Sequence, residues 1–235
     1  GQAEAPKGFT HWLLKFDGVS DLELGSTNGY GRVEMAYYLM AKDAEIEMME
    51  SRLLEENGRA HFMTRRFDRE DAKGKIHVQS FCAMRHYDFN EVILYSYEQL
   101  FETMRMLRLP YPAAEQLFRR MAFNIMARNC DDHTKNFAFI MDKTGKWSLS
   151  PAFDVCHSYR PGSPWVSQQS LSVNGKRRDI TRDDLLEVAR QMNIKKAASI
   201  INQINQVLSK WDDYAEQTKI KKELKEAVGK TLQIL

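Results

Sequence analysis

An apolar stripe followed at once by a dense polar loop is the feature of this sequence that most limits its possible folds. Residues 113–128 predict a helix with one broad apolar face, formed by Leu117, Phe118, Met121, Ala122, Ile125 and Met126. Residues 137–141 are again apolar and predict a short strand. The polar residues between these two segments are therefore expected to be held between two buried elements.

That loop reads Cys130-Asp131-Asp132-His133-Thr134-Lys135-Asn136. Five of its side chains can carry charge, transfer a proton or bind a metal: Asp131, Asp132, His133, Lys135 and Asn136. Polar clusters carried on a rigid scaffold are typical of functional sites. An alternative is a turn that simply ends the preceding helix, because Asn and Asp are common turn residues. The loop alone leaves both interpretations open.

The spacing inside the loop fits the requirements of phosphoryl transfer. That reaction needs a base beside the acceptor hydroxyl, metal ions that bridge the phosphates, and fixed positive charge. Protein kinases place the base aspartate five residues before a metal-binding asparagine. Asp131 precedes Asn136 by five positions and Asp132 precedes it by four, so we predict Asp131 as the catalytic base and Asn136 as a metal ligand. Lys135 would neutralise the transferring phosphate, and His133 would position the loop or a phosphate.

A second metal-binding carboxylate is expected shortly downstream. Residues 137–149 predict a hairpin, and Asp154 follows it within the segment Pro151-Ala152-Phe153-Asp154-Val155. Kinases place the aspartate of an Asp-Phe-Gly motif at this point, and Val155 stands here where the glycine would be. An isolated aspartate after a strand is usually a turn residue or a helix cap. Its order after Asp131 and Asn136 favours a metal ligand.

An early lysine would complete such a site. Residues 11–16 predict a mostly buried strand that carries Lys15, and a helix predicted over residues 32–41 carries Glu34. In kinases a strand lysine holds the α- and β-phosphates and pairs with a helix glutamate. We predict this pair here, although each residue taken alone is more simply explained as an exposed surface charge.

The rest of the chain divides into a β-rich part and a helical part. Further strands are expected over residues 47–54, 60–67 and 75–81, with a tight Asn57-Gly58 turn between the first two. We predict an α+β, bilobal, protein-kinase-like architecture. Residues 1–92 would form a small β-rich lobe remnant with one helix, and residues 93–235 a larger helical catalytic lobe.

Capping signals divide the helical part into separate elements. A capping box at Ser96 predicts a helix to about Leu107, and a second cap at Thr181 predicts a helix over residues 182–192. The prolines at 110 and 112 predict a break before the helix of residues 113–128. From Ala197 onward the pattern is helical again.

Composition excludes several classes of protein. The chain is 43% hydrophobic with a formal net charge of +2, which gives no bulk signal for nucleic-acid or membrane-surface binding. No apolar run approaches the roughly 20 residues needed to cross a bilayer. The three cysteines form no paired framework, so we expect reduced thiols and a cytoplasmic location.

The sequence resembles the HipA family of bacterial toxin serine/threonine kinases. The Asp-x-His-x-Lys-Asn pattern of residues 131–136 is similar to that family's catalytic loop. The resemblance extends to Arg66-Phe67-Asp68-Arg69, to residues 150–154 and to residues 171–177. It covers most of the chain, from about Trp12 to Ile194.

This resemblance implies a set of roles, a cofactor and partners. ATP and Mg²⁺ would bind between the lobes, with Asn136 and Asp154 holding the metal and Lys15 the phosphates. The nucleotide site would further be lined by Arg65, Arg66, Phe67, His133, Lys135 and Phe153. Members of the family phosphorylate a protein serine, typically on an aminoacyl-tRNA synthetase. They belong to type II toxin–antitoxin systems and are held in check by a DNA-binding antitoxin, so DNA would be contacted only indirectly.

Two departures from the family pattern keep other functions open. No Gly/Ser-rich phosphate loop precedes Lys15, the glycines of residues 25–31 lie on its wrong side, and Arg65 stands where some members carry Glu. We therefore expect a chain that lacks an upstream part of such a kinase and is inactive or weakly active by itself. One alternative is a small-molecule or lipid kinase, which shares the short loop motif. The other is a non-catalytic, pseudokinase-like module that binds an antitoxin or nucleic acid.

Overall fold

A three-stranded antiparallel sheet forms one end of the molecule. The computed structural model describes residues 6, 8–18, 29–70, 74–88 and 90–235. The sheet joins β1 (Trp12–Lys15), β2 (Ser51–Glu56) and β3 (Arg59–Arg65) in the order β1-β3-β2. Asn57 and Gly58 both adopt positive φ between β2 and β3, as the tight hairpin predicted from the Asn-Gly pair requires. The strand predicted at residues 47–54 starts later, at Ser51, because Met48 forms a bridge with Ala152 instead.

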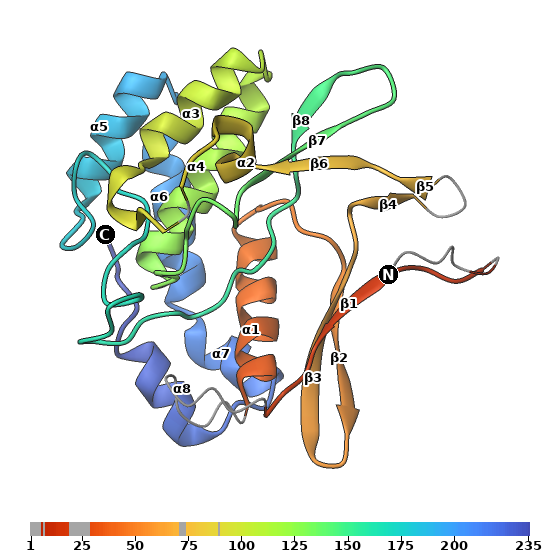
Figure 1. The fold of residues 1–235 in the computed structure, drawn as a ribbon. Helices are drawn as coiled ribbons and strands as arrows, with labels where there is room; N and C mark the ends of the chain where they lie inside the picture. The colour runs from red at the N-terminus through yellow and green to blue at the C-terminus, as the bar shows by residue number, and fades with distance from the viewer. Residues whose placement is uncertain (1–5, 7, 19–28, 71–73, 89) are drawn as a thin grey trace.

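One helix, α1 (Tyr30–Asp43), packs against this sheet (Figure 1). Gly31 makes the close approach possible, because a Cβ atom at this position would lie 2.1 Å from the carbonyl oxygen of Ala60 on β3. The opposite side of α1 contacts the helical part of the molecule, where the hydroxyl of Tyr37 donates to the carbonyl of Ala127 at 2.5 Å. The helix predicted over residues 32–41 is thus confirmed. Residues 25–28 of the predicted glycine-containing loop lie outside the described residues.

A second small sheet connects the two halves of the sequence. It joins β6 (His77–Ser80), β7 (Ala138–Met141) and β8 (Trp147–Leu149) in that order, and all pairs are antiparallel. The hairpin predicted over residues 137–149 is therefore confirmed. The strand predicted over residues 75–81 is shorter than expected, because Ser80 caps a short helix, α2 (Phe81–Arg85). A two-stranded ribbon, β4 (Arg69–Glu70) with β5 (Gly74–Lys75), precedes it.

Helices build the larger part of the molecule. They are a short 3₁₀ helix η1 (Val92–Leu94), α3 (Tyr97–Met106), α4 (Tyr111–Met126), α5 (Arg182–Met192), α6 (Ala197–Leu208), α7 (Trp211–Gln217) and α8 (Lys222–Gly229). The capping boxes at Ser96 and Thr181 are formed as predicted. The break predicted before residue 113 was misplaced, because Pro112 lies in the first turn of α4, where a missing N–H costs nothing. The α4 stripe is fully buried and belongs to one continuous core with α1, α3, α5 and α6.

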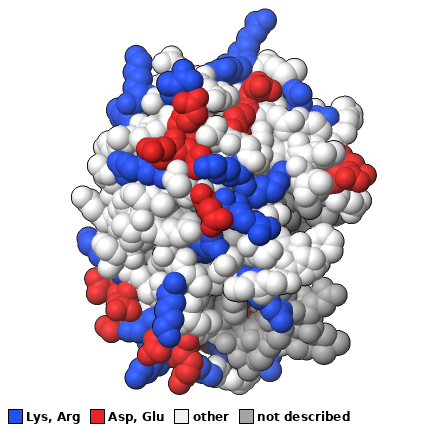
Figure 2. Space-filling view, turned by 90° about the vertical axis from the view of Figure 1, so that its left-hand side faces the viewer, with Lys and Arg blue, Asp and Glu red and all other residues white. Residues whose placement is uncertain are grey.

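The predicted α+β class is confirmed, while the lobe boundary after residue 92 stays a prediction. Strand β6 precedes that boundary and pairs with β7, which follows it. Among the described residues, no helix is long and apolar enough to span a bilayer. Basic and acidic side chains are intermixed on the face shown in Figure 2, in keeping with the nearly balanced net charge.

Candidate active site

An apolar pocket lies between the β1-β3-β2 sheet and the segment that follows β8. Its volume is about 380 Å³, within the usual range of small-ligand sites. Phe67 and Phe153 close one side with ring centroids 5.5 Å apart. The other lining residues are Leu13, Lys15, Glu34, Met48, Met49, Phe62, Thr64, Arg65, Arg66, Asp68, Ala152 and Asp154.

Lys15 stands at the charged end of this pocket. Its ammonium group donates to Oε1 of Glu34 at 2.7 Å and also pairs with the carboxylate of Asp154. β1 places Lys15 directly opposite Phe62 on β3, and α1, which carries Glu34, packs against that same strand. Burial acts to lower the pKa of Lys15, but the two carboxylates outweigh it and hold the pKa above its ordinary value.

Glu34 and Asp154 differ in their surroundings. Glu34 is buried, and this burial raises the pKa of its carboxyl group against the opposing effect of Lys15. Asp154 is exposed and has a φ of 56°, a left-handed conformation that is strained for most residues with a side chain. The segment is held in place because the N–H of Ala152 donates to the carbonyl of Glu47 at 2.7 Å. Strained backbone of this kind is often found at functional sites.

The loop after α4 brings the side chain of Asn136 to a cavity that Asp154 also lines. The Nδ2 of Asn136 donates to the backbone carbonyl of Asp131 at 2.8 Å, which leaves the side-chain Oδ1 available as a ligand. Asn136 and Asp154 line the same small cavity, together with Phe153 and Asp132. The two predicted metal ligands are therefore brought together, from opposite ends of the β7–β8 hairpin.

The two adjacent aspartates of the loop have different environments. The side chain of Asp131 is 46% exposed, and its Oδ1 lies 3.7 Å from Nε2 of His133. Partial burial raises the pKa of Asp131, while His133 acts to lower it. Asp132 is only 1% exposed, so an acceptor molecule could not reach it. This difference agrees with the spacing argument that favours Asp131 as the base.

Asp132 instead joins the loop to its surroundings. It accepts hydrogen bonds from the hydroxyl of Tyr97 at 2.7 Å, from Nε2 of Gln169 at 3.1 Å and from the N–H of Ser170 at 2.6 Å. Asn124 of α4 extends the network by donating to the hydroxyl of Tyr97. Burial nevertheless dominates and raises the pKa of Asp132 to about 6.

Replacing Asp132 by asparagine should change how stability depends on pH. The pKa of Asp132 is raised from an ordinary value of 3.8 to about 6 in the folded chain, so folding favours its protonated form. That contribution is complete below the unfolded pKa and is lost as pH rises through the folded pKa. Between about pH 4 and pH 7 the stability advantage of the wild type over Asp132→Asn should fall by up to about 3 kcal/mol, measured by urea unfolding. An advantage that grows with pH would contradict this assignment.

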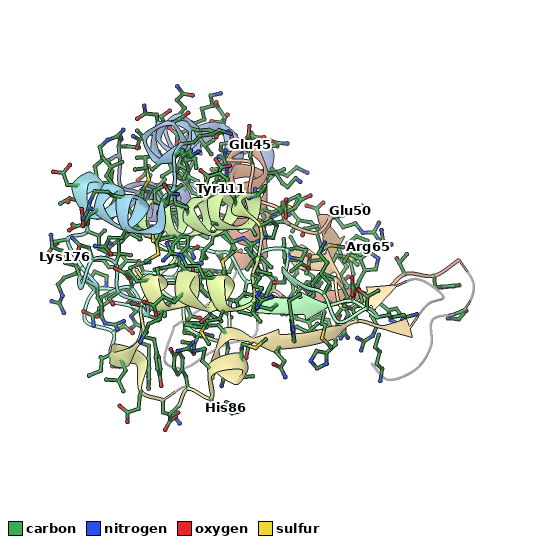
Figure 3. The ribbon with its side chains drawn as sticks, turned by 90° about the horizontal axis from the view of Figure 1, so that it is seen from above. Glu45, Glu50, Arg65, His86, Tyr111 and Lys176 are labelled. Carbon is green, nitrogen blue, oxygen red and sulfur yellow. The ribbon has the colours of Figure 1, made fainter. Side chains whose placement is uncertain are left out.

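The remaining predicted residues occupy mixed positions. Arg65 and Arg66 line the pocket, and Arg66 forms a two-pronged ion pair with Asp68, with an Nε–Oδ1 distance of 2.7 Å. Figure 3 shows Arg65 beside Glu50 and on the opposite side of the molecule from Lys176. His133 and Lys135, in the part of the chain that the structure describes, do not line this pocket.

Sequence reasoning missed much of the pocket wall and the role of Asp132. Phe62 and Thr64 alternate along β3, so a period of two could have marked the face that lines the pocket. The sequence around Met48 did not indicate that this residue lines the pocket, because the bridge with Ala152 that brings it there joins segments far apart in the chain. The partners of Asp132 are equally distant in sequence.

Comparison with known proteins gives one family and two informative folds. The family model of the HipA-like C-terminal domain matches residues 2–211. The chain is similar to HipA of Shewanella oneidensis MR-1, in a complex of HipA, HipB and operator DNA, with a TM-score of 0.70 and 15% identity over 93% of this chain and 55% of that one. It is also similar to the Helicobacter pylori proinflammatory kinase CtkA, with a TM-score of 0.53 and 13% identity over 93% of this chain and 84% of that one.

At these identities the two structures establish the fold alone, and the predicted kinase-like architecture is confirmed. The chain spans about half the length of the Shewanella HipA chain, 55% of it. Among curated proteins, none matches this sequence.

Proposed function

Because the chain belongs to the family of HipA-like C-terminal domains, we propose that it is the catalytic region of an ATP- and Mg²⁺-dependent serine/threonine protein kinase. The observation that carries this proposal is the convergence of Lys15, Glu34 and Asp154 at the charged end of an apolar pocket. Asp154 also borders the cavity that Asn136 lines, which supports a single site made of the pocket and the loop of Asp131.

The pocket suits ATP in both shape and charge. The rings of Phe67 and Phe153 would pack against one side of the adenine, with Arg65 and Arg66 at its border. Lys15 would bind the α- and β-phosphates, oriented by Glu34 as in other kinases. The raised pKa of Lys15 keeps this group positively charged at any pH at which the protein would work.

The residues present also fit a magnesium ion. A carboxylate from Asp154 and an amide oxygen from Asn136 are the hard oxygen ligands that Mg²⁺ prefers. No cluster of three or more His, Cys, Asp or Glu suited to a metal occurs among the described residues, and Mg²⁺ at kinase sites does not need one, because phosphates and water complete its coordination. Bound there, the ion would neutralise charge on the β- and γ-phosphates.

The loop residues would carry the transfer itself. Asp131 would orient the acceptor hydroxyl and take its proton while the serine oxygen bonds to the γ-phosphorus. The bond from that phosphorus to the β–γ bridging oxygen then breaks, and ADP leaves. Lys135 would neutralise the phosphate in transit, and His133, 3.7 Å from Asp131, would position that carboxylate.

The family also suggests a biological setting. We place the chain in a type II toxin–antitoxin system, in which a DNA-binding antitoxin restrains it and carries the only contact with DNA. HipA of Shewanella assembles with HipB and operator DNA, which supports this part of the proposal. A serine of an aminoacyl-tRNA synthetase is the kind of acceptor that family membership implies.

Phosphate transfer to protein serine tests the proposal directly. The chain is incubated with Mg²⁺ and radiolabelled ATP in the presence of bacterial protein, and labelled residues are identified by mass spectrometry. We expect phosphoserine or phosphothreonine on protein. Label on a metabolite or lipid alone would favour a small-molecule kinase. Because the chain is expected to be weakly active by itself, only the absence of label after long incubation at high protein concentration would favour a non-catalytic module.

Nucleotide binding should depend on Lys15. Replacement of Lys15 by methionine removes a charge-assisted contact to the phosphates, which is worth about 1.5–3 kcal/mol. We expect the Kd for Mg²⁺-ATP to rise about 10- to 100-fold in isothermal titration calorimetry. Lys146→Met, an exposed lysine between β7 and β8, is the matched control and should bind like the wild type. Equal affinity in both variants would remove Lys15 from the nucleotide site.

A further inference from the structure

We propose that the cavity lined by Asn136 and Asp154 binds one water molecule between Nε of Arg120 and Oδ1 of Asn129, and that this water helps to position the two metal ligands. Arg120 and Asn129 are then positioning residues, which act through the water and not on the substrate. The water site follows from contacts within the chain, whereas its effect on the metal ligands rests on the proposed function.

Arg120 is a buried guanidinium of α4 with an incomplete set of partners. It is 4% exposed, and it forms no ion pair with any residue that the structure describes. Burial lowers the pKa of Arg120 to about 10, so the group is still positively charged at neutral pH. Its Nη2 donates to the carbonyl of Ser150 at 2.7 Å, but its Nε–H has no hydrogen-bond partner within the described part of the chain. A buried donor without a partner costs free energy, which a ligand in contact with it would recover.

Asn129 carries a matching acceptor, and a directed chain of hydrogen bonds leaves that acceptor over. The hydroxyl of Tyr97 donates to the carboxylate of Asp132 at 2.7 Å, and Nδ2 of Asn124 donates to the same hydroxyl at 3.1 Å. Nδ2 of Asn129 in turn donates to Oδ1 of Asn124 at 3.0 Å. Because an ionised carboxylate can only accept, the direction of each bond in the chain is fixed. Oδ1 of Asn129, a residue that is 3% exposed, is the acceptor without a partner among the described residues.

The unpaired donor and the unpaired acceptor belong to side chains that line one small cavity. Arg120 and Asn129 both line it, together with Asn136 and Asp154. Its volume is about 10 Å³, measured at the centre of a water-sized sphere, which is the space that one water molecule needs. The cavity is therefore matched in size to a single small ligand.

The charges around the cavity select water over an ion. A cation would be repelled by the guanidinium of Arg120, and an anion would be repelled by Asp132 and Asp154, which also line the cavity. A water molecule can accept from Nε of Arg120 and donate to Oδ1 of Asn129 at the same time. Its second hydrogen can then be donated to an oxygen of Asp154 or Asn136, which gives the three hydrogen bonds typical of buried water.

Arg120 thereby connects α4 to both metal ligands. Asn136 lies in the loop that follows α4, and Ser150, whose carbonyl Arg120 holds, begins the segment that leads to Asp154. The N–H of Ser150 donates to the carbonyl of Ala138 on β7 at 3.0 Å, which fixes the start of that segment. Groups behind metal ligands orient them, and the loss of such groups typically lowers metal affinity or activity about 10- to 100-fold.

A crystal structure of the chain tests the water site and needs no turnover. We expect one water molecule within hydrogen-bond distance of both Nε of Arg120 and Oδ1 of Asn129. Its density should be lost in Arg120→Met and in Asn129→Leu, and crystals soaked in bromide should show no anomalous peak in the cavity. A bromide peak there, no density between the two groups, or pairing of either group with a protein atom would overturn the proposal. The wild-type structure decides this point even if a variant does not fold.

A double-mutant cycle in urea unfolding tests whether the two groups share one ligand. Each single substitution leaves the other group buried with a poorer set of partners, whereas Arg120→Met combined with Asn129→Leu removes both groups. The double variant should therefore unfold at a higher urea concentration than the sum of the two separate effects predicts. The bond from Arg120 to Ser150 cancels in the cycle, because it is missing from both variants of Arg120. Additive effects would contradict a shared water.

A Mg²⁺ titration of phosphate transfer tests the positioning role. In Asn129→Leu the Mg²⁺ concentration for half-maximal transfer should rise about 10- to 100-fold, with KM for the acceptor unchanged. Asn205→Leu is the matched control, since it removes two hydrogen bonds between Asn205 and Leu235 on α6, away from the cavity. A Mg²⁺ dependence that is the same in both variants would overturn the positioning role. If the wild type transfers no phosphate, the kinase proposal and the positioning role fail together, and the crystal structure still decides on the water.

Discussion

Asp131→Asn is expected to abolish phosphate transfer to serine while leaving nucleotide binding nearly unchanged. Asparagine keeps the size of the side chain but cannot accept a proton, and loss of a general base typically costs about 10²- to 10⁴-fold in rate. Asp131 does not line the nucleotide pocket, so the Kd for Mg²⁺-ATP should stay near that of the wild type. The measurement is initial-rate transfer from radiolabelled ATP at saturating nucleotide.

The control for this experiment is Asp183→Asn, an exposed carboxylate in the first turn of α5. It should transfer phosphate at the wild-type rate. Undiminished transfer by Asp131→Asn would reject Asp131 as the base. Because Asp132 is buried in a hydrogen-bond network, that outcome would require another base, such as His133.

Asp154→Asn should remove most of the activity and raise the Mg²⁺ concentration that the remaining activity requires. The substitution withdraws a formal charge from the proposed metal site and leaves Lys15 paired with Glu34 alone. A loss of about 10³-fold is expected from the removal of one charged group that stabilises the transition state. Transfer is measured across a Mg²⁺ titration, and half-maximal activity should move to a much higher Mg²⁺ concentration.

Asp179→Asn is a closely matched control. Asp179 is exposed and has a φ of 52°, close to the 56° of Asp154, and asparagine tolerates this left-handed conformation well. Any effect of Asp154→Asn that is absent from Asp179→Asn can therefore be assigned to the lost charge rather than to backbone strain. Identical Mg²⁺ titrations for both variants would remove Asp154 from the metal site.

Local patterns predicted the elements better than they predicted the site. The apolar face of α4, the Asn57-Gly58 hairpin and both capping boxes follow from residues close in sequence, and the structure forms all of them. The start of α4 was misplaced because proline is as compatible with a first helical turn as with a break. The kinase-like order of Lys15, Asn136 and Asp154 predicted one site, and the structure pairs Lys15 with Asp154 and places Asp154 in one cavity with Asn136.

Contacts between distant segments could not be predicted in this way. Asp132 is held by Tyr97, Gln169 and Ser170, which lie more than thirty residues away on either side. Nothing in the local sequence distinguishes the buried Asp132 from the partly exposed Asp131 beside it, except the spacing to Asn136. The apolar wall formed by Met48 depends likewise on a tertiary bridge, so side-chain chemistry alone could not include it.

The packing of α1 on both sides limits how this molecule could be regulated. In many kinases activity is controlled by the position of the helix that carries the paired glutamate, which moves toward or away from the strand lysine. Here Gly31 packs closely against the carbonyl of Ala60 on one side of α1. On the other side, the hydroxyl of Tyr37 donates a hydrogen bond to the carbonyl of Ala127. Because α1 is packed at both surfaces, we expect the Lys15–Glu34 pair to stay formed. Control would then have to act on access to the site rather than on its assembly.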